Sequence, residues 1–129
     1  MKPETRQWID KAEDDFDAAE ALLRRRTRAH HDTVCFHAQQ CIEKYLKARL
    51  VEAGAPFSKT HDLETLLDRL IPVEPLWAPM RSALNILTDY AVDFRYPGET
   101  ASREQAKEAL KVCRSLRRII REALRLSQD

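Results

Sequence analysis

The sequence predicts an all-α protein, an antiparallel bundle of four to five helices. Apolar residues recur at every third or fourth position in five successive segments of the 129-residue chain, which is the spacing of one buried helix face. Only 2 residues are glycine, while 33% are charged and 43% hydrophobic. This composition is typical of a charge-rich helical protein. The connections are short, so we expect successive helices to pack antiparallel in one domain that covers residues 1–129.

The first two helices are predicted from their apolar stripes. After a first helix over about residues 3–26, a break at about 27–32 precedes a second helical pattern that runs to Gly54. Gly54 stands where a left-handed cap is expected, and Pro56 prevents the helix from continuing. The stripe of the first helix consists of Trp8, Ala12, Phe16, Ala19 and Leu23.

Three further helices follow. Thr60 is predicted to be the N-cap of a short third helix that Pro72 ends. A fourth pattern runs from Leu76 to Ala91, with a proline at 79 that only the first turn of a helix tolerates. Ser102 and Gln105 form a capping-box pattern for the last helix. The apolar stripe of this last helix is Ala106, Ala109, Cys113, Leu116, Ile120 and Leu124.

The formal net charge of +1 conceals blocks of opposite sign. Three basic and seven acidic residues in 1–20 give −4, and seven against two in 21–50 give +5; four against eight in 51–100 give −4, and eight against four in 101–129 give +4. This balance argues against a uniformly basic nucleic-acid coat. No apolar run approaches the ~20 residues of a membrane span, and no apolar leader follows Met1, so we expect a cytoplasmic protein without membrane contact. Three cysteines without a CxxC pair indicate reduced thiols.

A cationic stripe is predicted along the last helix, opposite its apolar face. Two interpretations of it remain open. The stripe is either a solvated face, neutralised in part by the acidic blocks of this chain across a dimer, or a docking surface for a polyanion or an acidic partner. Its members are Arg103, Lys107, Lys111, Arg114, Arg118, Arg121 and Arg125.

Four short strings occur in a characteristic order along the chain. Trp8 comes with KA at 11–12 and Asp15, then CFHAQQCIEKYLKA covers 35–48, KTHDL covers 59–63 and RYP covers 95–97. This order resembles the HEPN family, named for a nucleotide-binding domain of higher eukaryotes and prokaryotes. The resemblance covers nearly the whole chain and implies an HEPN-like helical bundle that is usually a homodimer. It also implies a partner, because small HEPN proteins are commonly made beside a minimal nucleotidyltransferase in two-gene modules, several of which act as toxin and antitoxin.

Ribonuclease members of the family carry an Arg-x4-6-His motif near the start of the last helix and cut RNA without metal. In some of them the partner enzyme silences the toxin by adding AMP to a nearby tyrosine. Here the chain departs from that pattern, because Arg95 is followed by Thr100, Ala101 and Ser102 where the histidine should stand. The spacing occurs literally at residues 25–30 and 26–31, far from the family position, and we interpret that match as chance. The incomplete motif favours a protein that is not an enzyme.

We therefore expect the non-catalytic HEPN partner of a minimal nucleotidyltransferase, with no cofactor, that binds a nucleotide or an RNA phosphate. Tyr96 is either an exposed functional aromatic or a plug at the end of the bundle. The predicted ligand-binding residues are His37, Gln40, Lys44, Lys59, His61, Arg95 and Tyr96.

Two alternatives remain. A metal-independent endoribonuclease toxin would use Arg95 to stabilise the charged transition state and His61 or His37 to move the proton of the 2′-hydroxyl. A purely structural assembly subunit would use the basic stripe to dock an acidic partner.

Other polar residues of the second helix admit two explanations each. Gln39 and Gln40 are mid-helix amides that either pair between helices or meet a nucleobase or partner helix. His37 and Cys41 share a helix face at a spacing that suits two metal ligands, but Cys35 points away and Cys113 is expected on a distant helix. We therefore predict no metal site.

Overall fold

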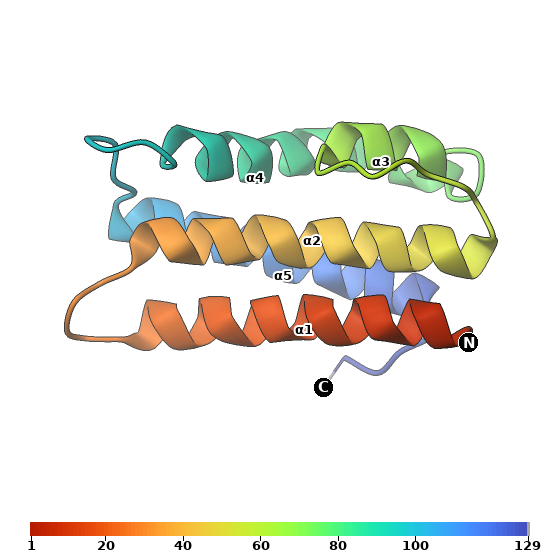
Figure 1. Cartoon of the computed structure of the whole chain (residues 1–129), viewed down its shortest axis with the longest axis horizontal. Coiled ribbons are helices and arrows are strands. Elements are labelled where there is room, and N and C mark those ends of the chain that lie inside the picture. Colours follow the sequence, from red (N-terminus) through yellow and green to blue (C-terminus); the bar gives the residue numbers. More distant parts are fainter. Residues whose placement is uncertain (129) are drawn as a thin grey trace.

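The computed structural model describes residues 1–128; Asp129, the last residue of the predicted domain, lies outside the described residues. These residues form five α-helices and one short 3₁₀ helix, and residues 1–128 contain no strand. The all-α prediction is thus confirmed (Figure 1). The elements are α1 (Pro3–Arg24), α2 (His31–Ala53), α3 (Leu63–Leu70), η1 (Pro75–Met80), α4 (Arg81–Asp93) and α5 (Arg103–Ala123).

The helix α2 is the centre of the bundle. It contacts each of the other four α-helices, and α1 runs beside it in the opposite direction (Figure 1). Its residues are buried on several sides, as expected for a helix that neighbours surround. The loop between α1 and α2, the end of α4 and the start of α5 all lie at one end of the molecule (Figure 1).

Local sequence signals explain the ends of the long helices. Ser102 Oγ accepts a hydrogen bond from Gln105 N (3.0 Å) while the Gln105 side chain accepts one from Ser102 N, which confirms the capping box. The predicted left-handed cap of α2 is also confirmed, with Gly54 at φ 70°. Around Gly54, the backbone N–H groups of residues 54 and 55 donate to the carbonyls of residues 51 and 50. The same pattern of backbone hydrogen bonds ends α5 around Arg125, which adopts φ 59° without being glycine.

Two predicted helix starts are wrong. The N-cap of α3 is Asp62, whose carboxylate accepts from Glu64 N, whereas Thr60 lies outside the helix and its hydroxyl accepts from Asp62 N. The fourth pattern is broken into η1 and α4 because Pro79 has no N–H to donate. Leu76, which the pattern placed on the buried stripe, is 89% exposed.

The cysteines are free and buried. Contrary to the sequence prediction, Cys113 is not distant from Cys41, because α2 packs on α5 and brings the two thiols together. Burial raises the pKa of the Cys41 thiol, and the neighbouring Cys113 thiol adds to the effect. Burial also raises the pKa of Cys35 to about 11, with a further contribution from the carboxylate of Asp32. Cys35 and Cys41 are therefore protonated, small apolar side chains at neutral pH.

A buried polar layer joins α1, α2 and α5. The Arg117 guanidinium donates two hydrogen bonds to Glu13 (2.6 and 2.8 Å), and Tyr45 Oη donates to the same carboxylate (2.6 Å). Arg121 Nη1 donates to Tyr45 Oη (2.8 Å). The acidic block of α1 therefore pairs with the basic block of α5 inside one chain, where the sequence suggested pairing across a dimer.

This layer corrects the predicted basic stripe. Arg121 is only 7% exposed, because its side chain turns inward to Tyr45 and to the carbonyl of Ser127. Arg114 stays exposed but pairs with Glu20 of α1 (2.9 Å). The other predicted members remain exposed, namely Arg103, Lys107, Lys111, Arg118 and Arg125.

Candidate functional site

A groove of about 510 Å³ lies where α2, the start of α3 and the end of α4 meet. The second helix contributes one wall, the segment before α3 provides His61, and Arg95 comes from the turn after α4. Three predicted ligand-binding residues, Gln40, His61 and Arg95, thus line one groove. Its full lining is Phe36, Gln39, Gln40, His61, Asp62, Thr88, Ala91, Val92 and Arg95.

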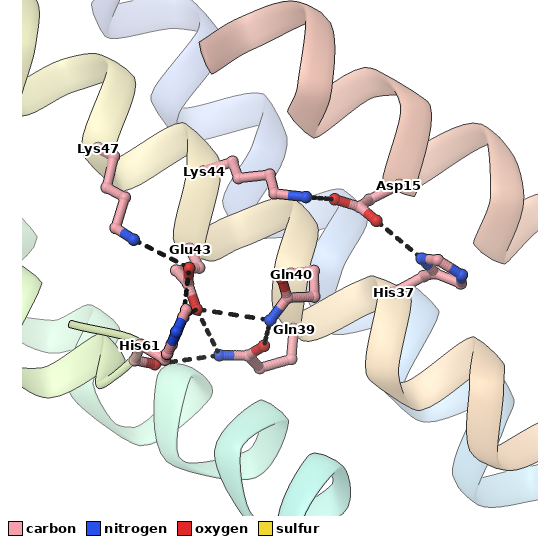
Figure 2. A network of polar contacts seen from close by, with 8 residues as sticks. All are labelled: Asp15, His37, Gln39, Gln40, Glu43, Lys44, Lys47 and His61. Carbon is pink, nitrogen blue, oxygen red and sulfur yellow. Dashed lines mark hydrogen bonds and ion pairs between the residues drawn. The ribbon is translucent and has the colours of Figure 1, made fainter. Parts of the chain in front are cut away.

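The carboxylate of Glu43 bonds to three residues that line this groove, Gln39, Gln40 and His61 (Figure 2). It is 2% exposed, and it accepts hydrogen bonds from Lys47 Nζ (3.0 Å) and from His61 Nδ1 (3.1 Å). The amides of Gln39 and Gln40 reach the same carboxylate at 3.5 Å. The negative charge of this buried carboxylate is therefore compensated by hydrogen-bond donors of the same chain.

The predicted amide pair is satisfied internally. Gln40 Nε2 donates to Gln39 Oε1 (2.8 Å), and Gln39 Nε2 donates to the carbonyl oxygen of His61 (3.3 Å). The second of these bonds joins α2 to the segment before α3, so it holds His61 against α2 (Figure 2). The pairing explanation therefore applies to Gln39, which needs no external nucleobase, whereas both hydrogen bonds of the Gln40 amide stay within α2.

His61 combines a fixed position with an open ring. Its side chain is 85% exposed, although Nδ1 lies 3.1 Å from Glu43 Oε2. When Nδ1–H donates to this carboxylate, the tautomer leaves Nε2 as a free acceptor. An imidazole oriented by a buried carboxylate can accept or deliver a proton or bind an anion when protonated.

His37 and Lys44 belong to a separate cluster on the side of α2 that faces α1 (Figure 2). His37 Nδ1 lies 2.7 Å from Asp15 Oδ1, and Lys44 Nζ donates to Asp15 Oδ2 (2.5 Å). Neither residue lines the groove, so the structure separates them from Gln40, His61 and Arg95. Both side chains are already bonded to the buried carboxylate of Asp15, so they join α2 to α1.

Lys59 and Tyr96 also lie outside the groove. Both are exposed, and Tyr96 lines a different shallow hollow together with Glu99 and Gln105. With 64% of its surface exposed, Tyr96 is not a plug of the bundle end. The structure therefore leaves it available as a surface aromatic.

Sequence reasoning missed several groove residues that share simple spacings. Thr88, Val92 and Arg95 stand at positions i, i+4 and i+7, so one face of α4 extends to the predicted arginine. Phe36 precedes Gln40 by four residues and is 44% exposed, which is unusual for an aromatic side chain in the most buried helix. An outward-facing aromatic at this spacing was the signal that could have identified it.

A further groove is mainly apolar and lies elsewhere. A groove of about 870 Å³ runs between η1, α4 and α5, with Trp77, Met80, Val112 and Leu116 on its walls. Leu76 and Ile119, which are 89% and 41% exposed, lie along it. Its α5 rim carries Glu104, Lys107, Glu108 and Lys111.

Two absences concern residues 1–128 alone. No cluster of three or more histidine, cysteine or acidic side chains there could hold a metal ion. Within the same range, no helix is both long enough and apolar enough to pass through a membrane.

The HEPN domain family model matches residues 5–123 of this chain. The chain belongs to the HEPN domain family. The match extends from the first turn of α1 to the last residue of α5, so the HEPN domain includes both walls of the polar groove and the buried polar layer. The sequence resemblance is thereby confirmed.

A curated relative comes from Methanocaldococcus jannaschii. This chain is 29% identical to the "Putative toxin MJ1304" of that organism over 137 aligned positions, which cover 92% of this chain and 86% of the relative. No solved structure matches this HEPN chain significantly.

Proposed function

We propose that this HEPN protein binds a nucleotide or an RNA phosphate in the groove between α2 and α4. The observation that carries the proposal is that Gln40, His61 and Arg95, which lie far apart in the sequence, line one hollow. Arg95 is exposed and forms no ion pair within residues 1–128, so its planar guanidinium can hold a phosphate through two parallel hydrogen bonds. The exposed ring of Phe36 beside it offers a stacking surface for a base.

Replacing Arg95 by glutamine is expected to weaken binding of AMP, ATP or a short RNA by roughly tenfold to a hundredfold. A hydrogen bond to a charged group contributes about 1.5–3 kcal/mol, and each 1.4 kcal/mol is a factor of ten. Titration at two salt concentrations measures the effect. Arg6→Gln is the matched control, because Arg6 is an exposed arginine near the start of α1 and does not line the groove. Absence of saturable binding to the wild-type protein at low salt would refute the proposal.

The biological setting we propose is a toxin-antitoxin type of two-gene module with a minimal nucleotidyltransferase as partner. The family membership and the name of the archaeal relative support the toxin-antitoxin part. The partner follows from the sequence resemblance. Co-expression with the product of the adjacent reading frame is expected to yield a stable complex, and recovery of the HEPN protein alone contradicts the partnership.

A metal-independent ribonuclease is the second candidate function, and the Glu43–His61 pair favours it. Arg95 would stabilise the charge of the transition state, and His61 would move the proton of the 2′-hydroxyl, with Glu43 selecting its tautomer. RNA degradation in EDTA that Arg95→Ala and His61→Ala both abolish is the expected result. An intact RNA substrate after incubation with wild-type protein eliminates this candidate and leaves the binding function standing.

We also propose that the protein forms a homodimer through its apolar groove. Acidic and basic residues alternate on the α5 rim, so two α5 helices that run antiparallel about an axis between Lys107 and Glu108 are complementary in charge. Glu104 would then face Lys111 of the partner subunit. The exposed Leu76 and Ile119 would be covered in the same interface.

The double variant Lys107→Glu/Lys111→Glu is expected to be monomeric in sedimentation equilibrium, because it places only acids along the rim of both copies. Adding Glu104→Lys and Glu108→Lys restores the alternation and should restore the dimer. A dimer that persists in the double variant, or a monomeric wild-type protein, contradicts this interface.

A further inference from the structure

A separate hollow at one end of the bundle is lined mainly by arginine side chains. Its volume is about 640 Å³, and it is separate from the groove that contains His61 and Arg95. Three stretches of the chain form it, namely the end of α1 with the following loop, the start of α2 and the start of α5 (Figure 1). The lining residues are Arg24, Arg25, Arg26, Ala29, His31 and Arg103.

A hydrogen bond between a side chain and the backbone joins two of these three stretches. Asp32 Oδ1 accepts a hydrogen bond from Ala101 N (2.6 Å), which ties the first turn of α2 to the residues just before α5. His31 and Arg103 are the first residues of these two helices, so both helices begin at the hollow. The positive ends of these two helix dipoles therefore lie at the hollow, together with the negative end of the α1 dipole.

The four guanidinium groups differ from other arginines of the bundle in their ion pairing. None of them forms an ion pair within residues 1–128, whereas Arg114 and Arg117 of α5 do pair with acids of α1. One or two cations at the end of α1 would suffice to complement its dipole, an effect of only about 0.3–1 kcal/mol each. Four exposed arginines around one hollow repel one another, and a bound polyanion removes that repulsion.

We propose that this arginine hollow, Arg24, Arg25, Arg26 and Arg103 with His31, binds the phosphate backbone of a single-stranded polynucleotide. The inference rests on the proposed function, because it assigns to the same ligand a second contact beyond the groove. His31 and Gln40 are nine residues apart on α2, which corresponds to ~13.5 Å along the helix axis. Phe36 lies between them in sequence and lines the groove. A nucleoside monophosphate has one phosphate and fills one site, whereas an oligonucleotide places phosphates in both.

The test compares the double variant Arg25→Gln/Arg26→Gln with a charge-matched control. Arg6→Gln/Arg69→Gln removes two exposed arginines that lie outside both sites. The probes are AMP and single-stranded RNA and DNA of about ten nucleotides, within the site sizes of single-strand binders. The magnitude of the slope of log K against log salt concentration is expected to fall by about 1.4 when two phosphate contacts are lost. This change corresponds to roughly a twentyfold loss of affinity at about 0.1 M salt. AMP affinity should not change.

The outcomes separate this inference from the proposed function. If Arg25→Gln/Arg26→Gln weakens oligonucleotide binding and Arg95→Gln leaves the binding of AMP and the oligonucleotide unchanged, the arginine hollow stands and the groove proposal fails. If Arg95→Gln weakens the binding of AMP and the oligonucleotide while Arg25→Gln/Arg26→Gln binds as tightly as its control, the groove proposal stands and this inference is overturned. The inference is also overturned if Arg25→Gln/Arg26→Gln abolishes the co-purification of a protein partner while oligonucleotide binding stays intact. Stronger binding of RNA than of DNA, or the reverse, identifies the polynucleotide.

Discussion

Replacing Glu13 by alanine is expected to lower the free energy of unfolding by about 2–3 kcal/mol. The substitution leaves Arg117, whose side chain is 10% exposed, and the hydroxyl of the buried Tyr45 without their acceptor. Breaking a fully buried charged pair costs about 3–5 kcal/mol, and the cost here is smaller because the Glu13 side chain is 27% exposed. Arg117 also stacks on Phe16, with its guanidinium carbon 4.3 Å from the ring centroid, and this contact should survive.

The same carboxylate makes stability depend on pH. Burial acts to raise the pKa of Glu13, but the hydrogen bonds from Arg117 and Tyr45, aided by the charges of Arg117 and Arg121, outweigh it and hold the pKa below the ordinary 4.5. A carboxyl whose pKa is lowered by folding stabilises the protein above its unfolded pKa and loses that effect as the pH falls through its folded pKa. The wild-type protein should therefore lose stability as the pH falls below about 4.5.

Urea unfolding at several pH values measures both effects. The difference between wild type and Glu13→Ala should be full at neutral pH and shrink as the pH falls below 4.5. Glu20→Ala is the control, because its partner Arg114 is 52% exposed and such a surface pair contributes less than about 1 kcal/mol. A Glu13→Ala protein as stable as the Glu20→Ala protein would show that the buried layer is not a source of stability.

Replacing Glu43 by alanine should lower the free energy of unfolding by about 3 kcal/mol and loosen the groove. Lys47, whose side chain is 8% exposed, would remain buried near Trp8 without its carboxylate. His61 and the two glutamines would lose their common acceptor, so the hydrogen bond from Gln39 to the His61 carbonyl would remain as the polar contact between His61 and α2. Ligand binding should weaken together with stability.

A double-variant cycle separates the two consequences. Glu43→Ala/Lys47→Met removes both buried charges and should recover most of the lost stability in urea unfolding. Ligand affinity should stay low in this double variant, because His61 still has no carboxylate to orient it. Recovery of stability and affinity together would show that Glu43 acts only through the fold. An unchanged stability in the single variant would contradict the burial argument.

Sequence reasoning predicted the helices well because their signals are local. The capping box at Ser102 and the glycine cap at Gly54 depend on residues within one or two turns of each other, and both are confirmed. The errors also have local causes. Pro79 divides the fourth pattern, and Asp62 is an N-cap with a carboxylate acceptor that competes with the hydroxyl of Thr60 two residues earlier.

The candidate site was predicted in part. Gln40, His61 and Arg95 came from the family-like strings, and the structure places all three in one groove. His37 and Lys44 came from the same string, but helical periodicity turns them toward α1, where Asp15 pairs with both. Counting along a helix assigns residues to the same face, yet it does not say which neighbouring helix that face meets.

By itself, the sequence determined that this protein is a helical HEPN domain, where its long helices end, and that charge alternates in blocks along it. Only the tertiary structure decided which charges meet. Arg117 pairs with Glu13 across 104 residues, Arg121 turns inward to Tyr45, and Arg103 joins the end of α1 in a hollow lined mainly by arginines. The physical reason is that a side chain's solvation and partners depend on how helices pack, and the packing brings together residues that no local pattern connects.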